Sequence, residues 1–458
     1  MKRVKLACIL VMIVMVVPQL LKAAPIVSLS LADLEQKGLA KSELFRSAQF
    51  DSQAAQYQAR VVKAALAPRL NIEGNYNYVT IVPELEVPIP NFPPVKFSDN
   101  TSYSIGPTLH WTLFDENALH NSWLSAQSMA RSKMFDAEAV RRQVLLQVRN
   151  TYLQLALAAE QTVLLSDALN LSLAQYNDIK VNVEAGTKSR SDKLSSHQDL
   201  LSKERSLSQA RADMAQSLRD LSDLTGVVFS SGVSIPIDVR AAGSLPDDVT
   251  APSVEIELDS HDRLYQRFAS FQMEHLWQDH PSLSSLTELA KAAHQTADSA
   301  SAGYWPTFQL MARTSLDYPN GPILEKFNQT SAGVTVNWPL FDAGNTRNRI
   351  RQNEKISELN MEKHDQALAD MTRDWNKAMD QIASLEEQKH INETAVSESA
   401  ELVDIIYKAY KSGARTYLDV ENADLQALEA KNQLAITRVH IVMNLVVLAS
   451  LSEDNNPK

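Results

Sequence analysis

Four short segments of the chain alternate apolar and polar residues with a period of two. They lie at residues 70–78, 103–113, 308–318 and 334–340. Successive side chains of a β-strand point to opposite faces, so each segment is predicted to be a strand with one apolar and one polar face. Each is about ten residues long, the length of a strand that crosses a bilayer at a tilt.

Aromatic residues such as Trp111 and Trp338 lie near the ends of these strands, where membrane strands carry interfacial girdles. A soluble sheet packed on helices gives the same alternation. The membrane interpretation rests on four such strands in a chain that has an export signal, described below, and no other strand-rich region. Four strands cannot close a barrel, and an open edge in lipid leaves backbone groups unsatisfied. We therefore expect a barrel shared between chains, as a dimer or a trimer.

Two much longer segments have the pattern of α-helix. Residues 115–185 contain neither proline nor glycine, and residues 342–412 are broken only by Gly344 in the first turn. Each can form one helix of about 70 residues, or ~105 Å. Asp115 and Asp342 stand at the start of these helices, where a carboxylate can cap the first turn.

Apolar residues in the long segments follow 3,4 spacing, for example at Leu368, Met371 and Trp375. This spacing predicts a coiled-coil seam, although the core stripe of a plain helical bundle gives the same local pattern. Shorter helices, each about half as long, are predicted for four further segments: 31–66, 191–224, 262–301 and 416–451.

The chain contains an internal repeat. The segment Trp111-Thr-Leu-Phe-Asp115 matches Trp338-Pro-Leu-Phe-Asp342. Gly186 and Gly413 stand in a second pair of matching segments, and their separation in the chain equals that of the two tryptophans. A rigid helix between these landmarks explains the constant register, because one inserted residue would rotate every later side chain by about 100°.

Upstream of the strands the separation is larger, since Pro68 matches Pro306. The additional residues fall in the proline-rich stretch 82–94, which we predict to be a loop. The linker between the repeats has short β-like pieces such as 233–239 and is expected to form a small belt around the middle. The predicted organisation is a signal peptide (1–23), a first repeat (24–226), an equatorial linker (227–260) and a second repeat (261–458).

The amino terminus has the features of a secretory signal peptide, since basic residues precede an apolar run at 6–17 and the small residues Ala23 and Ala24 follow. The run is too short for the ~20 residues of a membrane-spanning helix, and we expect no second run of that kind in the mature chain. Cys8, the only cysteine, lies in this run with Lys5 where a lipidation motif needs an aliphatic residue. Cleavage near Ala23 would leave a cysteine-free chain that depends on packing for stability.

The composition favours helices, because only 12 of 458 residues are glycine and Ala, Leu, Gln, Ser, Glu and Lys are abundant. Loss of the signal peptide reduces the 44 basic residues to about 40 against 55 acidic ones, a net charge near −15. We expect no binding of nucleic acid.

Patterns of catalysis, cofactor binding and metal binding are missing from the sequence. The ten histidines are scattered, and neither a His-x-x-x-His pair, a cysteine cluster nor a glycine-rich phosphate loop occurs. We expect neither an enzyme nor a protein with a cofactor or metal.

Taken together, the strand pairs ending in Leu-Phe-Asp, the long helices and the Gly-x5-Asp turns at 186–192 and 413–419 resemble the outer-membrane efflux protein family typified by TolC. The resemblance covers essentially the whole mature chain. It implies a homotrimer with a shared twelve-stranded barrel in the outer membrane, continued by a helical tunnel in the periplasm. It further implies docking onto an inner-membrane pump through a periplasmic adaptor (membrane fusion) protein.

By the same resemblance, four residues belong to the periplasmic entrance of the tunnel. Asp192, Tyr410 and Arg415 match positions where the family holds the entrance shut, and Asp419 matches an acidic ring that narrows it. A ring of carboxylates favours cations. Both acids also fit helix N-caps after a glycine turn, and Arg415 fits a solvated surface arginine, so these alternatives stay open.

Two positions depart from the family pattern. Glu116-Asn117 replaces the glycine-rich step after the first Leu-Phe-Asp, whereas Ala343-Gly344 is closer to it. Asn422 stands where a second acid of the ring is expected, and Glu421 or Asp424 is a candidate replacement.

The sequence therefore predicts a mostly α protein with a small shared β-barrel, the outer-membrane exit duct of a tripartite efflux pump or a type I secretion system. Such a duct is a passive channel gated at its helical tip. The alternatives are a periplasmic or surface coiled-coil protein or adhesin without a conduit, against which the lipid-facing aromatics argue, and a simple porin, which lacks such long helices. Drugs, metal ions, peptides and protein toxins all stay open as cargo.

Overall fold

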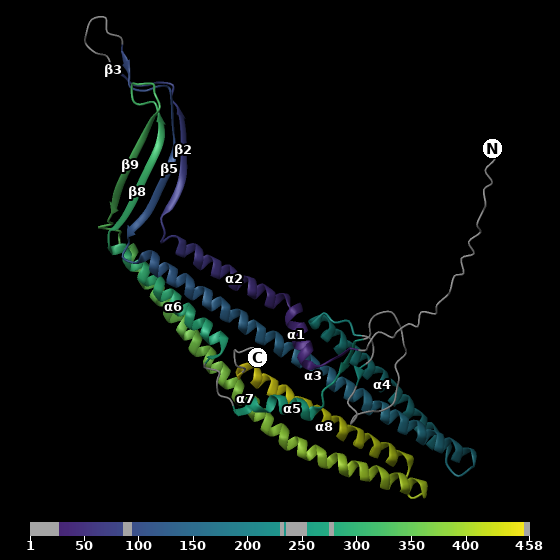
Figure 1. The fold of residues 1–458 in the computed structure, drawn as a ribbon. Coiled ribbons are helices and arrows are strands. Elements are labelled where there is room, and N and C mark those ends of the chain that lie inside the picture. Colours follow the sequence, from purple (N-terminus) through teal and green to yellow (C-terminus); the bar gives the residue numbers. More distant parts are fainter. Residues whose placement is uncertain (1–26, 86–93, 230–232, 235–253, 274–278, 453–458) are drawn as a thin grey trace, which may run out of the picture.

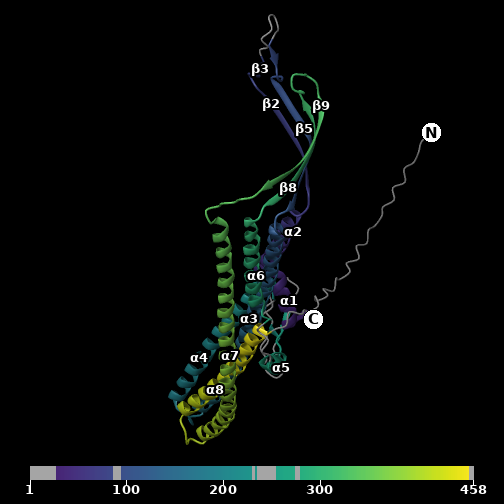
Figure 2. The ribbon, with the colours of Figure 1, turned by 90° about the vertical axis from the view of Figure 1, so that its left-hand side faces the viewer.

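The protein is elongated, with a β-sheet at one end and two helical hairpin turns at the other (Figure 1). The structure, a computed structural model, describes residues 27–85, 94–229, 233–234, 254–273 and 279–452. Figure 2 shows the same arrangement from the side, with the strands above and the hairpin turns below. The predicted signal peptide lies outside the described residues.

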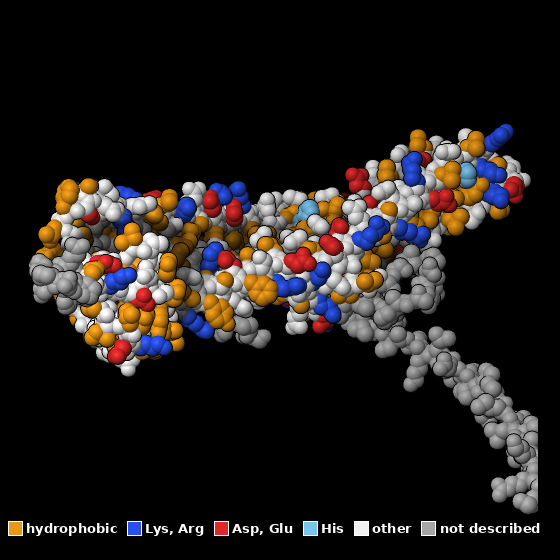
Figure 3. Space-filling view, turned by 90° about the horizontal axis from the view of Figure 1, so that it is seen from above, with side chains coloured by type: hydrophobic (Ala, Val, Ile, Leu, Met, Phe, Trp, Pro, Cys, Tyr) orange, Lys and Arg blue, Asp and Glu red, His pale blue; other side chains and the backbone are white. Residues whose placement is uncertain are grey.

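The four predicted strands form one antiparallel sheet in the order β2–β5–β8–β9. Their bounds are Arg69–Tyr78 (β2), Thr101–Phe114 (β5), Thr307–Tyr318 (β8) and Phe327–Asn337 (β9). The register places Leu70 opposite Leu109 and Trp111 opposite Leu310, so the predicted apolar sides share one face. Many of these side chains are exposed, and Figure 3 shows hydrophobic side chains at the surface of this end. Such a face suits lipid rather than water.

The opposite face of the sheet is polar. Asn71 lies opposite Thr108, and Ser104 lies opposite Asp317. The Ser104 hydroxyl donates a hydrogen bond to the Asp317 carboxylate (2.7 Å). A closed barrel of such sheets would have a polar interior.

Two long helices continue from the sheet. They are α3 (Ala118–Glu184) and α7 (Asn345–Lys411), each 67 residues and therefore about 100 Å long. Each is followed by a 36-residue helix that runs back from the tip, α4 (Arg190–Thr225) or α8 (Tyr417–Ser452). The predictions of two long helices and of these two shorter ones are confirmed.

Two shorter helices that the sequence predicts as continuous are divided. The segment 31–66 forms α1 (Leu31–Lys41) and α2 (Glu43–Ala64), because Ser42 leaves the helix and its hydroxyl accepts a hydrogen bond from the Phe45 N–H (3.1 Å). The segment 262–301 forms α5 (His261–Ala269), a 3-10 turn (Ser270–Met273) and α6 (Pro281–Ser301), with a further 3-10 turn at Ala302–Tyr304. Proline has no N–H to bond backward, so a new helix begins at Pro281 with His280 as its cap. The predictions of single helices here are wrong.

The helix α8 also corrects an expectation. Among the described residues it is the one helix that contains a stretch long and apolar enough to cross a membrane, so the prediction of no second apolar run is wrong. More than half of this apolar stretch is buried, and Val442, Leu445 and Val446 belong to the protein core. A core helix meets the same criterion of length and composition, and the packing of α8 identifies it as one.

The main core lies at mid-length, where α1, α3, α5, α7 and α8 meet around Leu34, Tyr152 and Trp375. Beside it, the Glu35 carboxylate accepts hydrogen bonds from Arg149 (2.7 Å) and Arg267 (2.8 Å), which ties α1 and α5 to α3.

The remaining strands are short. A parallel sheet in the order β1–β7–β6 joins β1 (Val27–Leu29) to two pieces of the linker, β7 (Val254–Glu257) and β6 (Val233–Ser234). The rest of the predicted β-like piece at 235–239 lies outside the described residues. At the far end of the molecule, β3 (Glu84–Leu85) pairs with β4 (Val95–Lys96).

The helices of the two repeats pack side by side. Near the sheet the contacts follow the order α2–α3–α6–α7, and toward the tip they follow α4–α3–α8–α7. Along the whole length, α7 therefore forms one edge of the molecule, and α2 or α4 forms the other.

Candidate functional site at the helical tip

Two glycine turns close the hairpins at the tip. Gly186 follows the end of α3 with φ of +76°, and Gly413 follows the end of α7 with φ of +82°. Glycine permits this left-handed conformation, which a side chain disfavours. The Ser189 hydroxyl then caps α4 by accepting a hydrogen bond from the Asp192 N–H (3.1 Å). Both hairpin turns are short, and they lie close together at the same end of the molecule (Figure 1).

Tyr410, in the last turn of α7, joins the two tips. Its hydroxyl points at the Asp192 carboxylate over 3.5 Å, a long hydrogen bond. Lys188 of the first turn donates from Nζ to the Tyr410 carbonyl (2.7 Å) and lies 3.8 Å from the centre of its ring. Tyr410 is only 3% exposed. Two of the predicted gate residues therefore lie together within a single chain.

The ring of Tyr410 belongs to a small apolar core between the hairpins. It packs edge-to-face on Tyr417, with ring centroids 5.8 Å apart, and Ile179 and Val420 complete the buried cluster. Burial, with the neighbouring Asp192 carboxylate second, raises the pKa of Tyr410, and burial raises that of Tyr417 as well. Both hydroxyls therefore stay protonated at any physiological pH.

Tyr407 makes a parallel link one turn earlier in α7. Its hydroxyl donates to the Asp178 carboxylate of α3 (3.2 Å), and Lys411 lies 3.7 Å from the same carboxylate. Burial, followed by the charge of Asp178, raises the pKa of Tyr407 to about 12. Together, the tyrosines of α7 hold the second hairpin against the first.

Arg415 and Asp419 belong to the second turn. The Asp419 carboxylate accepts hydrogen bonds from the Thr416 N–H and hydroxyl, both at 2.9 Å, in a capping box. These bonds, with the charge of Arg415 as a smaller contribution, lower the pKa of Asp419. Arg415 is exposed, and within one described chain no ion pair joins it to Asp192. The structure thus brings Asp192 and Tyr410 together and leaves Arg415 at the surface of the turn.

The candidate replacements for the second acid of the ring lie elsewhere. Asn422 is exposed, whereas Asp424 accepts a hydrogen bond from the Gln175 amide of α3 (2.8 Å). Glu421 faces Asp199 of α4. Burial is the first cause of a raised pKa at both Glu421 and Asp424. These two carboxyls therefore lie at the contact between the hairpins and do not extend the surface that Asp419 and Asn422 share.

Sequence reasoning missed Lys188, Tyr407 and Tyr417. The repeat could have revealed Lys188, because it matches Arg415 in the same register that matches the two turn glycines and gives each turn one cation at the same position. The two tyrosines occupy apolar stripes of their helices, and their pattern does not separate them from ordinary core residues.

At the other end of the long helices, Asp115 and Asp342 bind the first turns. Asp115 accepts from the Leu119 N–H (2.9 Å), and Asp342 accepts from the Thr346 N–H (2.7 Å). Each aspartate stands two residues before the residue at the N-cap position, which is Asn117 or Gly344.

The turn between strand and helix has the same shape in both repeats. Glu116 and Asn117 have φ of 49° and 64°, and Ala343 and Gly344 have φ of 54° and 83°. The missing glycine of the first repeat therefore leaves the turn unchanged. A residue with a side chain pays about 1–2 kcal/mol for this conformation.

Trp111 and Trp338 lie where strands meet helices. Each indole N–H donates to a carbonyl just beyond the preceding helix, Leu66 O at 3.3 Å or Tyr304 O at 3.2 Å. Both side chains stay partly exposed. An amphipathic ring with a bonded polar edge is typical of a membrane interface.

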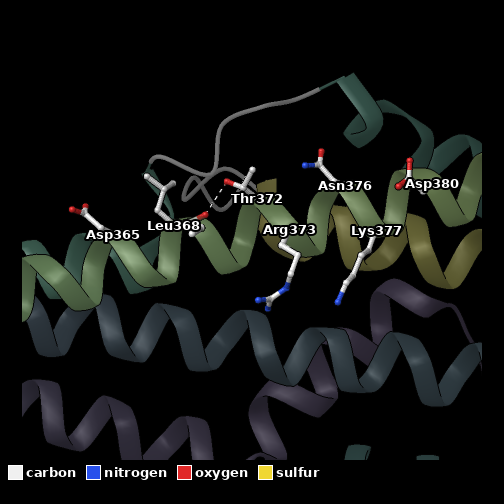
Figure 4. Close-up of a pocket in the computed structure, with 8 residues that line it drawn as sticks. Asp365, Leu368, Thr372, Arg373, Asn376, Lys377 and Asp380 are labelled. Atoms are coloured by element: carbon white, nitrogen blue, oxygen red, sulfur yellow. Dashed lines mark hydrogen bonds between the residues drawn. The ribbon is translucent and has the colours of Figure 1, made fainter.

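A hollow along α7 does not form a further site. All eight residues that line it belong to α7, and Figure 4 shows Arg373 and Lys377 on one side of the helix with Asn376 and Asp380 on another. Arg373 is paired with Asp370 of the same helix (2.6 Å). Walls from a single helix do not enclose a ligand. In the described part of the chain, no group of three or more His, Cys, Asp or Glu is placed to hold a metal ion.

A sheet with a lipid-suited face, continued by helical hairpins of about 100 Å, defines an outer-membrane channel with a helical extension. The model of the outer membrane efflux protein family matches residues 34–227 and 274–452. The chain belongs to this family. It is similar to the outer membrane efflux protein BepC of Brucella suis biovar 1 (strain 1330), with 23% identity over 374 residues, 81% of this chain and 74% of the relative.

Solved structures share the fold over nearly the whole chain. CusC superposes with a TM-score of 0.72 at 17% identity and covers 92% of both chains. VceC of Vibrio cholerae gives 0.70 at 16% identity, over 92% of this chain and 96% of its own. The open state of the MtrE channel of Neisseria gonorrhoeae gives 0.70 at 16% identity, over 92% and 88%. The predicted family, fold class and outer-membrane location are confirmed.

Proposed function

We propose that the protein is the exit duct of a tripartite efflux pump or a type I secretion system and works as a homotrimer. The observation that carries this proposal is the direct continuation of a lipid-suited sheet into hairpins of about 100 Å. One molecule then reaches from the outer membrane deep into the periplasm. The two halves of the duct wall in each chain would be the repeats 24–226 and 261–458, which residues 227–260 join in sequence.

The open edges of the chain support assembly. The described strands β2 and β9 each pair on one side only, and an unpaired edge in lipid costs several kcal/mol per unsatisfied group. Three four-stranded sheets supply twelve strands, enough for a closed barrel with a polar interior. The family resemblance favours three copies over two.

The contacts at the tip support a gate there. The links from Tyr410 to Asp192 and from Lys188 to the Tyr410 backbone hold the second hairpin against the first. An adaptor that binds the separated hairpins better than the closed ones would open the entrance, because only such differential binding shifts the equilibrium. The inner-membrane pump supplies the cargo and the energy, and the duct itself is passive.

Extraction of outer membranes with mild detergent tests this proposal. We expect a detergent-stable trimer by light scattering, and cross-linked pull-down from cells should capture a periplasmic adaptor. A monodisperse monomer in detergent-free buffer would support the coiled-coil scaffold or adhesin instead. If the trimer captures no adaptor, the proposal of a duct would stand, but the proposal that it belongs to a tripartite pump would be rejected.

A further inference from the structure

We infer that a basic hollow between α2 and α3, just below the sheet, binds the phosphate of an anionic phospholipid in the periplasmic leaflet of the outer membrane. The two helices lie side by side beneath the strands (Figures 1 and 2). Such a site requires the outer-membrane location that the family shows, but it does not require a conduit. It would fix the depth of the chain in the bilayer.

The lining of the hollow is basic. Its volume is about 370 Å³, and the residues around it include Arg60, Lys63 and Arg131 but neither aspartate nor glutamate. Arg131 is already paired with Glu288 of α6 (2.8 Å). Within the described part of the chain, no carboxylate pairs with Arg60 or Lys63, which are exposed and one turn apart on α2. Two neighbouring cations without an acid attract an anion.

Aromatic rings orient both cations. The Lys63 ammonium lies 4.9 Å from the centre of the Trp123 ring, at the start of α3, and the Arg60 guanidinium lies 5.3 Å from the centre of the Tyr57 ring. Contacts of this kind hold a cation in place without neutralising its charge. The Trp123 ring also gives the hollow an apolar wall, on which the glycerol and first methylene groups of a lipid can pack.

The end of α2 lies on the lipid-facing side of the sheet. Trp111 belongs to the apolar face, and its indole N–H donates to the Leu66 carbonyl just beyond α2 (3.3 Å). Interfacial tryptophans mark the edge of the hydrocarbon layer. Leu66 is therefore placed near this edge, with the hollow directly beneath it.

This position sets the cations at the depth of the headgroups. Lys63 precedes Leu66 by three residues, which is about 4.5 Å along a helix, and the headgroup layer is roughly 5–8 Å thick. The Lys63 ammonium is thus level with the lipid phosphates. Arg60 lies one turn lower, and its long side chain can extend to the same level.

The second repeat shows that the fold does not require this chemistry. The three residues of the site have equivalents there that share none of it: Asp298 for Arg60, Ser301 for Lys63 and Ile350 for Trp123. An acid at the equivalent position would repel a phosphate. The basic hollow therefore belongs to the first repeat alone, and a trimer would carry three such sites.

The charge of the hollow selects the class of lipid. A phosphatidylglycerol headgroup carries one net negative charge, which two cations favour. The headgroup of phosphatidylethanolamine carries an ammonium as well, which the same cations repel. The planar guanidinium of Arg60 can bind two phosphate oxygens at once, and Lys63 adds a point charge beside it.

Native mass spectrometry of the full chain in a neutral detergent tests the site, with phosphatidylglycerol or phosphatidylethanolamine added. The site variant is Arg60→Asp with Lys63→Ser, which gives these exposed positions the residues that the second repeat has in α6. The matched control is Lys41→Ser with Arg46→Asp, which makes the same change of charge at exposed positions near the other end of α2.

Wild type and the control should retain phosphatidylglycerol roughly tenfold more tightly than phosphatidylethanolamine, and the site variant should lose this preference. Equal retention of phosphatidylglycerol by wild type and the site variant would overturn the assignment. Equal retention of both lipids by wild type would also overturn it, and this comparison holds even if the variant fails to fold. Binding of inorganic phosphate alone, with no gain from phosphatidylglycerol, would assign the hollow to a free anion and overturn the lipid site.

Discussion

The hydroxyl of Tyr410 lies 3.5 Å from the carboxylate of Asp192, across the two hairpin tips of one chain. This contact joins the end of α7 to the first turn of α4, so the hairpins cannot separate while it holds. The Tyr410 ring is buried between them, which limits competition from water. The hydroxyl can therefore be removed without removing the packing.

We expect Tyr410→Phe to loosen the tip and raise channel conductance in planar bilayers. Loss of one hydrogen bond of about 1 kcal/mol shifts the closed-to-open balance several-fold. Tyr176→Phe is the matched control, because the Tyr176 ring packs on His197 inside the first hairpin. Equal conductance of wild type and Tyr410→Phe would exclude this hydroxyl from the gate.

Arg415→Ser is also expected to raise conductance. The guanidinium is exposed within one chain. In the proposed trimer it would face the hairpins of the next copy, and its loss would weaken pairing with an acid there. An exposed pair contributes about 0–1 kcal/mol, so the effect should be at most a few-fold. Arg211→Ser, an exposed position in α4 away from the turn, should leave conductance unchanged. Equal conductance of the Arg415→Ser and Arg211→Ser channels would identify Arg415 as a solvated surface residue.

His280 should make α6 sensitive to acid. Burial first, and the charge of Arg142 second, lower its pKa from 6.5 to about 4. A lowered histidine pKa means that the folded protein favours the neutral side chain. The contribution of His280 to the free energy of unfolding is therefore complete above pH 6.5 and is lost as the pH falls toward 4.

Serine offers a test, because Ser42 caps α2 at the equivalent position of the first repeat. We expect His280→Ser to keep the cap and to lessen the loss of stability between pH 7 and 4.5, by roughly 1–2 kcal/mol. Thermal unfolding followed by the helical circular dichroism signal measures this, with His440→Ser, at an exposed position, as control. An identical acid loss in wild type and His280→Ser would contradict the assignment.

The sheet should not tolerate a side chain at Gly106. A Cβ atom there would overlap the Thr314 carbonyl oxygen in β8. Backbone of a paired strand cannot move away freely, so Gly106→Ala should cost about 1–3 kcal/mol and lower the amount of assembled protein in the outer membrane. Gly74→Ala places its Cβ 3.8 Å from Ile105, an ordinary contact, and should assemble normally. Equal trimer bands on a native gel would refute the expected clash.

The strands and long helices could be predicted because their signals are local. Alternation at 70–78 identifies a strand, and the absence of proline and glycine from 115–185 permits a single helix. The division of the predicted helix 262–301 before α6 could have been predicted from Pro281. The division of 31–66 at Ser42 has a weaker signal in the sequence, since serine also occurs inside helices.

The tip contacts depend instead on segments far apart in sequence. Lys188 meets Tyr410 across 222 residues, and Tyr407 meets Asp178 across 229. Periodicity shows which face of a helix is apolar but not which segment covers it. The left-handed conformation of Glu116 and Asn117 could not be predicted from local sequence either. Local propensity disfavours this conformation, and the strand-to-helix turn imposes it.

Single-channel recording on the purified wild-type trimer in planar bilayers tests most directly whether the assembled protein encloses a conduit. We predict discrete, reproducible conductance steps with a preference for cations, because Asp419 carboxylates of several copies would line the entrance. Insertion of a verified trimer without conductance above the bare bilayer would contradict the account.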